Sequence, residues 1–357
     1  MRTAVVLFNL GGPDKPEAVG PFLTNLFSDP AIISLPAPLR WLAARLIAAR
    51  RTPRAQQIYA GMGGGSPILG HTRQQADALA SALADLDEVR CFIAMRYWHP
   101  MSDETAAKVR DFGPDEVILL PLYPQFSTTT TASSFRDWDR AAVACGLDAP
   151  SRRICCFGYD TNYLRGLTRL VAKGLAEARN EAPGAKIRLL FSAHGLPERI
   201  VAAGDPYQWQ VEETAAAVAT ALGEPELDWL VSYQSRVGPL KWIGPATDAE
   251  VIRAGGDGAA LVVVPVAFVS EHAETLVELD MDYRRLAKAH HVPAYIRIPA
   301  LGTDPAFVDC LAQLVRTARM SMAPVCSALD GRKCPDSLVK CVIPGLTNGI
   351  DESELRR

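Results

Sequence analysis

The chain has 357 residues, of which 48% are hydrophobic and 22% charged, and its net charge is −3. This length favours two domains over one, and a nearly balanced charge without a long basic run argues against nucleic acid as a partner. The longest apolar run, at 259–269, is too short to cross a bilayer, which takes about 20 residues. The first ten residues are too short an apolar stretch for a secretory signal, so we expect a cytoplasmic protein.

Runs typical of buried strands alternate with helical patterns along the chain. Strands are predicted at 3–9, 90–95, 116–121, 187–193, 228–234, 260–268 and 293–298, and helices at, for instance, 72–86, 163–179 and 207–222. Such alternation is typical of parallel sheets joined by crossover helices. The sequence therefore predicts an α/β fold.

The chain also repeats itself weakly. Residues 7–13 resemble residues 190–197, and residues 120–127 resemble residues 264–270. A strand followed by proline also arises by chance, which is the alternative interpretation. If the repeat is real, it predicts two similar Rossmann-like domains, each a parallel sheet flanked by helices, with a cleft between them.

The predicted division places an N-terminal α/β domain at 1–155 and a C-terminal α/β domain at 156–322. Residues 323–357 differ in character, because proline, glycine, lysine and cysteine dominate and helical periodicity is lost. We interpret them as an appended tail.

An acidic segment follows the longest apolar run. If residues 270–283 form an α-helix, with about 100° per residue, Glu271, Glu274, Glu278 and Asp282 lie within an arc of roughly 80°. Four like charges on one face repel unless water or a cation screens them. A solvated helix face is one interpretation. The position at the carboxyl end of a central strand, where open α/β sheets bind ligands, favours a cation path.

His194 ends another predicted strand just before a turn. A lone histidine is usually structural, but the carboxyl end of a strand in an α/β domain is a common ligand site. A neutral imidazole there can bind a divalent metal or accept protons. We expect His194 to face the acidic segment across the cleft.

Several motifs in order resemble the ferrochelatase family over nearly the whole chain. They begin with Asn-Leu-Gly-Gly-Pro at 9–13 and end with His-Ala-Glu-Thr-Leu at 272–276, and the others lie at 51–68, 96–100, 122–127, 192–197, 204–207 and 234–239. The resemblance implies a lyase that inserts Fe²⁺ into protoporphyrin IX to form protohaem, the terminal step of haem biosynthesis, with release of two protons. Its partners are then protoporphyrin IX and Fe²⁺, and a homodimer is expected.

Other functions stay open. A coproporphyrin ferrochelatase has a similar substrate, since both porphyrins carry propionates. A cobalt chelatase is less favoured, because the Arg-Thr-Pro and Gly-Gly-Gly-Ser-Pro motifs are present. A haem- or metal-binding protein without turnover is the alternative outside enzymes.

The resemblance assigns His194 and Glu274 to the family's metal and proton site. His194 is expected nearest the ring nitrogens, where it takes protons and holds Fe²⁺, and Glu274 is expected as its partner across the ring. An imidazole, or an enclosed carboxylate with a raised pKa, suits a base that works near neutral pH. Glu271, Glu278 and Asp282 are predicted to relay protons or Fe²⁺, with ordinary solvated carboxylates as the alternative. His272 is about 100° from Glu271 in an ideal helix, so it is not expected to share their face unless the helix starts irregularly.

The same resemblance supplies a set of porphyrin-binding residues. They are Leu10, Arg51, Tyr59, Ser66, Arg96 and Tyr97. A guanidinium and hydroxyls are suitable donors for the propionates. Arg96 has a structural ion pair as its alternative role. The glycines at 63–65 lack the spacing of a phosphate loop and are expected to approach a flat ligand closely.

Residues 31–51 combine an apolar, proline-broken lip with a basic amphipathic helix. In the family this lip covers the pocket. Apolar side chains beside arginines also suit transient docking on an anionic membrane, peripheral to its inner face. A helix packed on the protein's own core is the alternative.

The tail contains Cys326, Cys334 and Cys341 with the spacing C-x₇-C-x₆-C, which matches no zinc-finger pattern closely. Many ferrochelatases have an extension with three cysteines that, with a fourth elsewhere, holds a [2Fe–2S] cluster. The resemblance implies such a cofactor here. Bound zinc or plain reduced thiols are the alternatives.

The fourth cluster ligand departs from the animal branch of the family. Thr128 stands where those proteins have the cysteine. Cys155 or Cys156 is the candidate for the fourth ligand in this chain, and Cys145 is a less favoured candidate.

Overall fold

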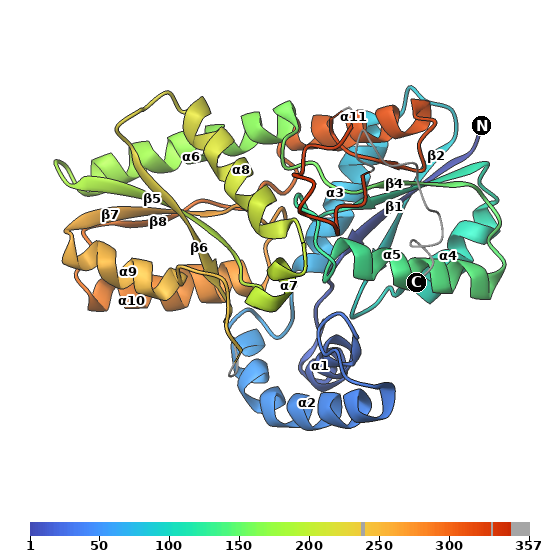
Figure 1. Cartoon of the computed structure of the whole chain (residues 1–357), viewed down its shortest axis with the longest axis horizontal. Coiled ribbons are helices and arrows are strands. Elements are labelled where there is room, and N and C mark those ends of the chain that lie inside the picture. The colour runs from blue at the N-terminus through green and yellow to red at the C-terminus, as the bar shows by residue number, and fades with distance from the viewer. Residues whose placement is uncertain (237–239, 330, 344–357) are drawn as a thin grey trace.

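The computed structural model describes residues 1–236, 240–329 and 331–343. Two parallel β-sheets lie side by side with helices on both faces of each, and a helical pair projects from the junction between them (Figure 1). The α/β fold predicted from the alternation of strands and helices is confirmed.

The first sheet has the strand order β2-β1-β3-β4-β9. Its strands are β1 (Thr3–Asn9), β2 (Val89–Met95), β3 (Glu116–Pro121), β4 (Ser151–Ile154) and β9 (Val325–Cys326). The helices α3 (Ile68–Ala82) and α11 (Pro305–Met320) pack on one face, and α4 (Ser102–Phe112) and α5 (Thr131–Cys145) pack on the other. Every residue of β1 and β3 is buried, as expected for central strands covered on both faces.

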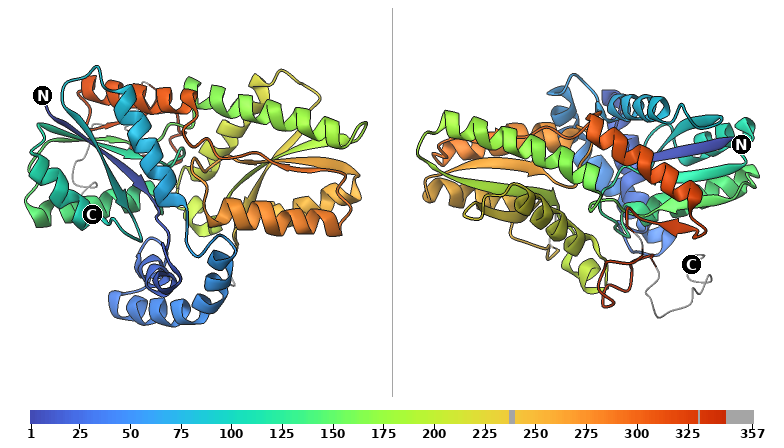
Figure 2. Two further views of the ribbon diagram at one scale, coloured as in Figure 1. Left: turned by 180° about the vertical axis from the view of Figure 1, so that it is seen from behind. Right: turned by 90° about the horizontal axis from the view of Figure 1, so that it is seen from above.

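The second sheet has the order β6-β5-β7-β8. Its strands are β6 (Asp228–Gln234), β5 (Lys186–His194), β7 (Ala259–Pro265) and β8 (Tyr295–Arg297). The helices α6 (Thr161–Glu181) and α8 (Tyr207–Ala221) cover one face, and α9 (Thr247–Gly256) covers the other with α10 (Tyr283–Ala289) beside it (Figure 2).

The two sheets repeat one topology. In each, the first strand in sequence lies between the second and the third, and the fourth lies outside the third. The weak sequence repeat therefore reflects two units of the same architecture. The domain limits at 155 and 322 stay predictions, and α11, which precedes 322, packs against α3 and β4 of the first unit.

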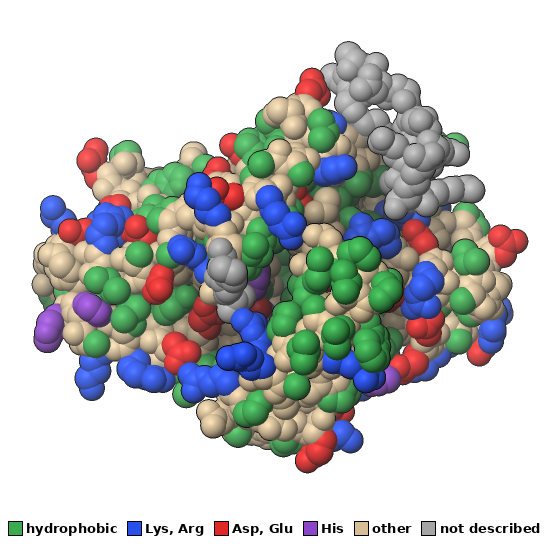
Figure 3. Space-filling view, turned by 60° about the horizontal axis from the view of Figure 1, so that its bottom comes forward, with side chains coloured by type: hydrophobic (Ala, Val, Ile, Leu, Met, Phe, Trp, Pro, Cys, Tyr) green, Lys and Arg blue, Asp and Glu red, His purple; other side chains and the backbone are tan. Residues whose placement is uncertain are grey.

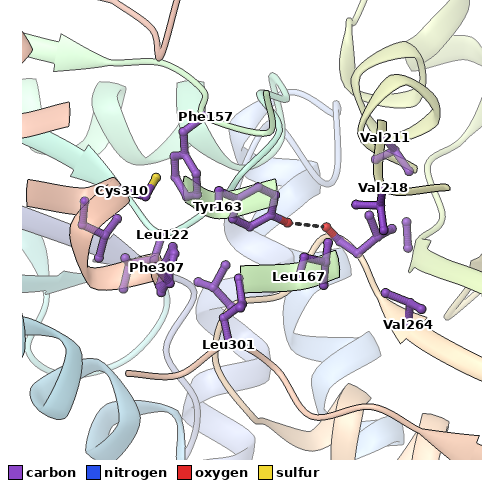
Figure 4. Close-up of a cluster of buried hydrophobic side chains, with 14 of the residues drawn as sticks. Leu122, Phe157, Tyr163, Leu167, Val211, Val218, Val264, Leu301, Phe307 and Cys310 are labelled. Carbon is purple, nitrogen blue, oxygen red and sulfur yellow. Dashed lines mark hydrogen bonds between the residues drawn. The ribbon is translucent and has the colours of Figure 1, made fainter. Parts of the chain in front are cut away.

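One continuous core joins the two units. Leu122 and Phe157 share it with Val264 of the second sheet and with Phe307 of α11 (Figure 4). Within this core the Tyr163 hydroxyl donates a hydrogen bond of 3.0 Å to the carbonyl of Val266 (Figure 4). Because the core is shared, the relative position of the sheets is set by close packing rather than by a linker.

The projecting pair consists of α1 (Val19–Ser28), after the short turn η1 (Pro16–Ala18), and α2 (Ala37–Ala60). The two helices pack on each other below the sheets in the view of Figure 1. A further short helix, α7 (Glu198–Ala202), follows β5.

The observed limits differ from the predicted ones where local chemistry intervenes. The strand predicted at 260–268 ends at Pro265, after which the Val266 amide turns back to bond the Val264 carbonyl. The sequence reasoning missed β4, because Ser151, Arg152 and Arg153 are polar, and it missed β9, which has two residues. Both are short strands at one edge of the first sheet, where hydrophobic patterns are weakest.

Candidate active site

A cleft of about 1160 Å³ opens between the two units. It is lined by residues at the carboxyl ends of strands in both sheets, such as Asn9, His194 and Gln234, which are the last residues of β1, β5 and β6. Open α/β sheets place ligands at this end of their strands. The size and the largely apolar lining suit one large flat ligand with a few polar groups.

The lip and the neighbouring helix α1 form one wall of the cleft. Phe22 and Phe27 of α1, Ile32 and Ile33 after it, and Ile47 of α2 line the cleft. Outside, hydrophobic side chains gather on a surface patch beside a hollow, with Lys and Arg side chains around it (Figure 3). The lip therefore presents apolar groups both inward and outward.

Buried polar side chains fix the two units to each other beside the cleft. Gln75 of α3 donates hydrogen bonds from Nε2 to the carbonyls of Val269 (2.9 Å) and Gly302 (3.0 Å). Its Oε1 accepts one from the Ser270 hydroxyl at 2.9 Å. Asn9 Nδ2 approaches the same Ser270 hydroxyl at 3.5 Å. These contacts hold the segment that leads to Glu274.

His194 and Glu274 are in direct contact. The imidazole Nδ1 lies 2.9 Å from Oε2 of Glu274, and both side chains line the cleft with 38% and 28% of their surface exposed. Both come from the second unit, one from the end of β5 and the other from the helix after β7. The expectation that they face each other across the ring is wrong, because no macrocycle fits between atoms 2.9 Å apart. Both side chains instead reach the cleft from the second unit.

The pair shifts the pKa of each partner. Burial alone would lower the pKa of His194, but the charge and hydrogen bond of Glu274 outweigh it, so this pKa is raised from 6.5. Burial would raise the pKa of Glu274, but the charge of His194 outweighs it and lowers this pKa to about 2. Glu274 is therefore ionised at neutral pH and orients an imidazole that can take up a proton.

The acidic segment does not form the α-helix assumed for the single acidic face. Glu274–Asp282 form a π-helix, with hydrogen bonds to the fifth residue, and residues 271 and 272 precede it without helical structure. The predicted single face is therefore wrong. Because the start is irregular, His272 comes to lie in the cleft, with Nε2 3.9 Å from Oε2 of Glu274 and burial lowering its pKa.

Glu278 is the relay candidate that lines the cleft. Its carboxylate accepts hydrogen bonds from the Ser235 amide (2.8 Å) and hydroxyl, from Gln234 Nε2 (3.3 Å) and from the Tyr283 hydroxyl (2.9 Å). Ser235 has a positive φ of 61°, a conformation that costs energy for a residue other than glycine. The carboxylate therefore fixes the loop after β6 beside His194.

Glu271 and Asp282 lie outside the lining of the cleft. Glu271 pairs with Arg297 at 2.8 Å and accepts the Ala300 amide at 3.0 Å. Burial would raise its pKa, but the charge of Arg297 lowers it overall. Asp282 is partly exposed and pairs with Arg285 at 3.0 Å. The geometry does not bring these two carboxylates together with Glu278.

The predicted porphyrin-binding residues divide into two groups. Those that line the cleft are Leu10, Arg51, Tyr59, Ser66 and Tyr97. Burial and the charge of Glu274 raise the pKa of Tyr59, so its phenol stays protonated near the His194 pair. The glycine run approaches the protein's own backbone: a Cβ on Gly65 would lie 2.7 Å from the Asp14 carbonyl oxygen.

Arg96 belongs to the second group. Its guanidinium donates to Asp29 at 2.9 Å and to Ser133 at 2.8 Å, and it lies 3.8 Å from Asp137. These contacts support the structural ion pair that was its alternative role.

Several cleft residues escaped the sequence reasoning. Tyr207, Gln234 and Tyr283 line the cleft, and their place depends on how loops meet across the two units. The positions of 207 and 234 within the matched motifs were the available signal.

The candidate cluster cysteines gather at the edge of the first sheet. The Cys155 amide donates to the Cys326 carbonyl at 2.8 Å, and Gln210 Nε2 lies 3.2 Å from Cys334 Sγ and 3.8 Å from Cys156 Sγ. Cys334 and Cys341 are free thiols, and the hydrogen bond between their side chains lowers the pKa of Cys341.

Cys145 ends α5 and contacts the Ala142 carbonyl at 3.4 Å. Within the described ranges, no three His, Cys, Asp or Glu side chains stand together as a ready metal site.

None of the described helices combines the length and the apolar character that a bilayer crossing needs.

Two solved structures with a similar fold are of SirB, a sirohydrochlorin chelatase. The sirohydrochlorin chelatase SirB from Bacillus subtilis subspecies spizizenii, in complex with cobalt, superposes with a TM-score of 0.52 at 12% identity, covering 89% of this chain and 96% of that one. SirB from Bacillus subtilis with Fe³⁺ gives a TM-score of 0.53 at 14% identity, with the same coverage. At such identities the likeness defines the fold alone, and that fold is of the chelatase type.

The sequence comparisons define the family. The ferrochelatase family model matches residues 2–319. Ferrochelatases from Caulobacter vibrioides (strain NA1000 / CB15N) and Phenylobacterium zucineum (strain HLK1) are 51% and 54% identical to this chain over 343 residues, covering 95% and 93% of it and 97% of each relative. The ferrochelatase of Rickettsia bellii (strain OSU 85-389) is 43% identical over 346 residues, covering 96% of this chain and 95% of that protein. The chain belongs to the ferrochelatase family.

Proposed function

We propose that the protein inserts Fe²⁺ into protoporphyrin IX and releases two protons. The observation that carries this proposal is the His194–Glu274 pair inside a large, mostly apolar cleft in a chain of the ferrochelatase family. The apolar macrocycle is bound by the apolar lining, and the porphyrin nitrogens meet a base that is oriented in advance.

Proton removal falls to His194. When Nδ1–H donates to Glu274, the other ring nitrogen keeps its lone pair and can accept a pyrrole proton. Glu274 stays ionised and stabilises the imidazolium that forms. His272, whose pKa is lowered by burial, stays neutral beside the pair and can serve as a ligand for incoming Fe²⁺.

Glu278 is proposed as the acceptor for protons that leave His194. It lines the same cleft and lies one helical turn after Glu274. Its hydrogen bond to the Tyr283 hydroxyl would continue a path for protons away from the ring nitrogens. Glu271 and Asp282 would act only indirectly, since their carboxylates are paired with arginines.

Protoporphyrin is preferred over coproporphyrin on the chemistry of the lip. Ile32, Ile33 and Phe27 offer apolar contacts, which suit vinyl and methyl groups better than additional propionates. Arg51 of α2, whose guanidinium lies over the Phe27 ring, also lines the cleft and can pair with a propionate. The test is the anaerobic rate of Fe²⁺ insertion into each porphyrin, read by loss of porphyrin fluorescence. Faster turnover of coproporphyrin would refute this choice, and no turnover of either would favour a binding protein.

Transient contact with an anionic membrane is proposed for the lip. Leu39, Trp41 and Leu46 of α2 each expose more than half of their surface, and only Ala44 and Ala48 of this helix are buried. Each side chain that inserts at the headgroup boundary adds up to about 2 kcal/mol, and each nearby arginine adds about 1 kcal/mol on an anionic surface. A cytoplasmic location at the inner face of the membrane would follow.

Vesicle sedimentation tests this contact. The double change Leu39→Ser and Leu46→Ser should lower binding to anionic vesicles at least tenfold, while Val143→Ser, at an exposed apolar residue of α5, should leave it unchanged. Equal vesicle binding by the unaltered protein, the double variant and Val143→Ser would contradict the proposal.

Homodimerisation is a separate prediction, tested by sedimentation equilibrium.

A [2Fe–2S] cluster is proposed at the cysteine group. Four thiolates are the usual ligands, and the thiols of Cys156, Cys326, Cys334 and Cys341 are suitable in type and number. Cys156 is favoured over Cys155 because it shares the Gln210 amide with Cys334. When bound, the cluster would link the tail to the first sheet, and it has no step in metal insertion, which is not a redox reaction.

The visible absorption of the purified protein tests the cluster. A brown protein that loses its colour on Cys334→Ser but keeps it on Cys145→Ser would support the proposal. A colourless protein with bound zinc, made in iron-replete cells, would contradict it.

A further inference from the structure

A buried aspartate lies between the end of α1 and the start of the lip. Asp29 follows the last residue of α1 and is only 3% exposed. Its Oδ2 accepts hydrogen bonds from Arg96 Nη2 (2.9 Å), the Tyr97 hydroxyl (2.8 Å) and the Ser133 hydroxyl, and its Oδ1 accepts the Ala31 amide at 2.8 Å. The carboxylate therefore has four donors.

The end of a helix does not by itself favour an aspartate. The carboxyl end of α1 carries the negative pole of the helix dipole, where a carboxylate is disfavoured. Taking a charge out of water adds a further cost unless it is paired and hydrogen-bonded. Asp29 is tolerated there because Arg96 and the hydroxyls of Tyr97 and Ser133 compensate its charge. Helix capping therefore does not explain the position of this aspartate, whereas its contacts next to the lip do.

The donors belong to the rigid part of the first unit. Arg96 and Tyr97 follow β2, and Ser133 lies in the first turn of α5. Asn25 of α1 adds a bond to the Tyr97 carbonyl at 3.1 Å. The end of α1 is thus held to the sheet and to α5 by several independent contacts.

On the other side, Asp29 shapes the chain that covers the cleft. Its own carbonyl accepts the amides of Ile32 (3.0 Å) and Ile33 (2.9 Å), and both of these isoleucines line the cleft. Arg40 of α2 closes the turn with bonds to the carbonyls of Ser28 and Leu35. A displacement of Asp29 would therefore move the isoleucines directly.

We propose that Asp29 is a positioning residue that holds the apolar edge of the lip over a bound porphyrin and so sets how long the porphyrin stays. This inference rests on the proposed function, because it assumes that a porphyrin occupies the cleft. Asp29 itself does not line the cleft, so it acts through residues that do. These are Ile32 and Ile33, whose amides donate to its carbonyl, and Tyr97, whose hydroxyl donates to its carboxylate.

The matched control is a second buried carboxylate in the first sheet, at the amino ends of its strands. Glu116 starts β3, at the opposite end of the sheet from the cleft, and is 4% exposed. It bonds Arg152 (2.6 Å), Arg319 (2.9 Å) and the Thr3 hydroxyl (3.0 Å). Asp29→Asn and Glu116→Gln therefore remove similar charge-assisted networks, and only the first network touches the lip.

The experiment measures protoporphyrin IX release by stopped-flow fluorescence, together with KM and kcat for Fe²⁺ insertion. Asp29→Asn should speed release about tenfold and raise KM, with kcat changed less than about twofold, because an Arg–carboxylate bond is replaced by a weaker neutral one. Ser133→Ala, which removes one donor outside the cleft, should give a smaller change in the same direction. Glu116→Gln should leave release unchanged.

The outcomes separate the two proposals. If the unaltered protein neither binds protoporphyrin nor inserts iron, the proposed function fails. If it does both, and Asp29→Asn and Ser133→Ala release porphyrin no faster than Glu116→Gln, the positioning role is overturned. If Asp29→Asn does not fold, the comparison of Ser133→Ala with Glu116→Gln decides.

Discussion

Replacing Gln75 with leucine should weaken the junction between the two units. Gln75 is fully buried, and its amide makes three hydrogen bonds, of 2.9, 3.0 and 2.9 Å, to residues of the second unit. Leucine has a similar volume but no polar atoms. The Val269 carbonyl still accepts the Gly302 amide, whereas the Gly302 carbonyl and the Ser270 hydroxyl lose these partners. At a net value of about 1 kcal/mol for each bond lost, we expect a loss of about 2–4 kcal/mol in the free energy of unfolding.

Urea-induced unfolding, followed by far-UV circular dichroism, measures this loss. Gln313→Leu is the control, because Gln313 is an exposed residue of α11 with a single bond to Thr317, and such changes stay within about 0.5 kcal/mol. Porphyrin affinity should fall as well, since Ser270 leads to the segment that carries Glu274. If Gln75→Leu unfolds like the control, the junction does not depend on these bonds and the reasoning is refuted.

Two further predictions concern the base and the packing of the second unit. In Glu274→Gln the charge that raises the pKa of His194 is lost and burial remains, so the acid limb of the pH–rate profile should move to lower pH; an unchanged or higher limb would contradict the coupling. In Gly174→Ala of α6 the new Cβ would lie 2.7 Å from Ile298 Cγ2. Overpacking should therefore cost about 1–3 kcal/mol in the free energy of unfolding, more than the better helix propensity of alanine adds. In the control, Gly70→Ala of α3, the new Cβ meets nothing within 4 Å, so the change should be neutral or stabilising by up to about 1 kcal/mol. Thermal unfolding of the two alanine variants checks this difference, and equal unfolding temperatures would refute it.

The central strands were predictable because they are buried on both faces. Continuous apolar runs such as 3–9 and 116–121 coincide with β1 and β3. The last two strands at one side of the first sheet gave no such signal, because β4 is polar and β9 has two residues. The order of strands within each sheet follows from chain crossovers, which single-sequence periodicity does not encode.

The site was predictable in its residues more than in its geometry. His194 and Glu274 came from the matched motifs, but their direct contact depends on a π-helix that begins at Glu274. An α-helical period applied to the same residues placed Glu271 on one face with Glu274 and Glu278, and it left His272 off that face unless the helix began irregularly, which it does. The π-helix is visible only in the fold, and so are the hydrogen bonds that Glu278 within it accepts from residues distant in the sequence.

The role of Arg96 illustrates a further limit. Its motif suggested substrate binding, whereas its partner Asp29 lies 67 residues away in the sequence. No local pattern reports such a pairing. The lip's apolar character was readable, but the contacts that hold it in place were not.

The most direct test of the account is the Fe²⁺ insertion rate of His194→Ala with protoporphyrin IX under anaerobic conditions, with porphyrin binding measured on the same samples. Loss of a positioned base should lower kcat about 10²–10⁴-fold, while the apolar cleft keeps its porphyrin affinity. A variant that binds porphyrin and still inserts iron at the unaltered rate would contradict the central role of the His194–Glu274 pair.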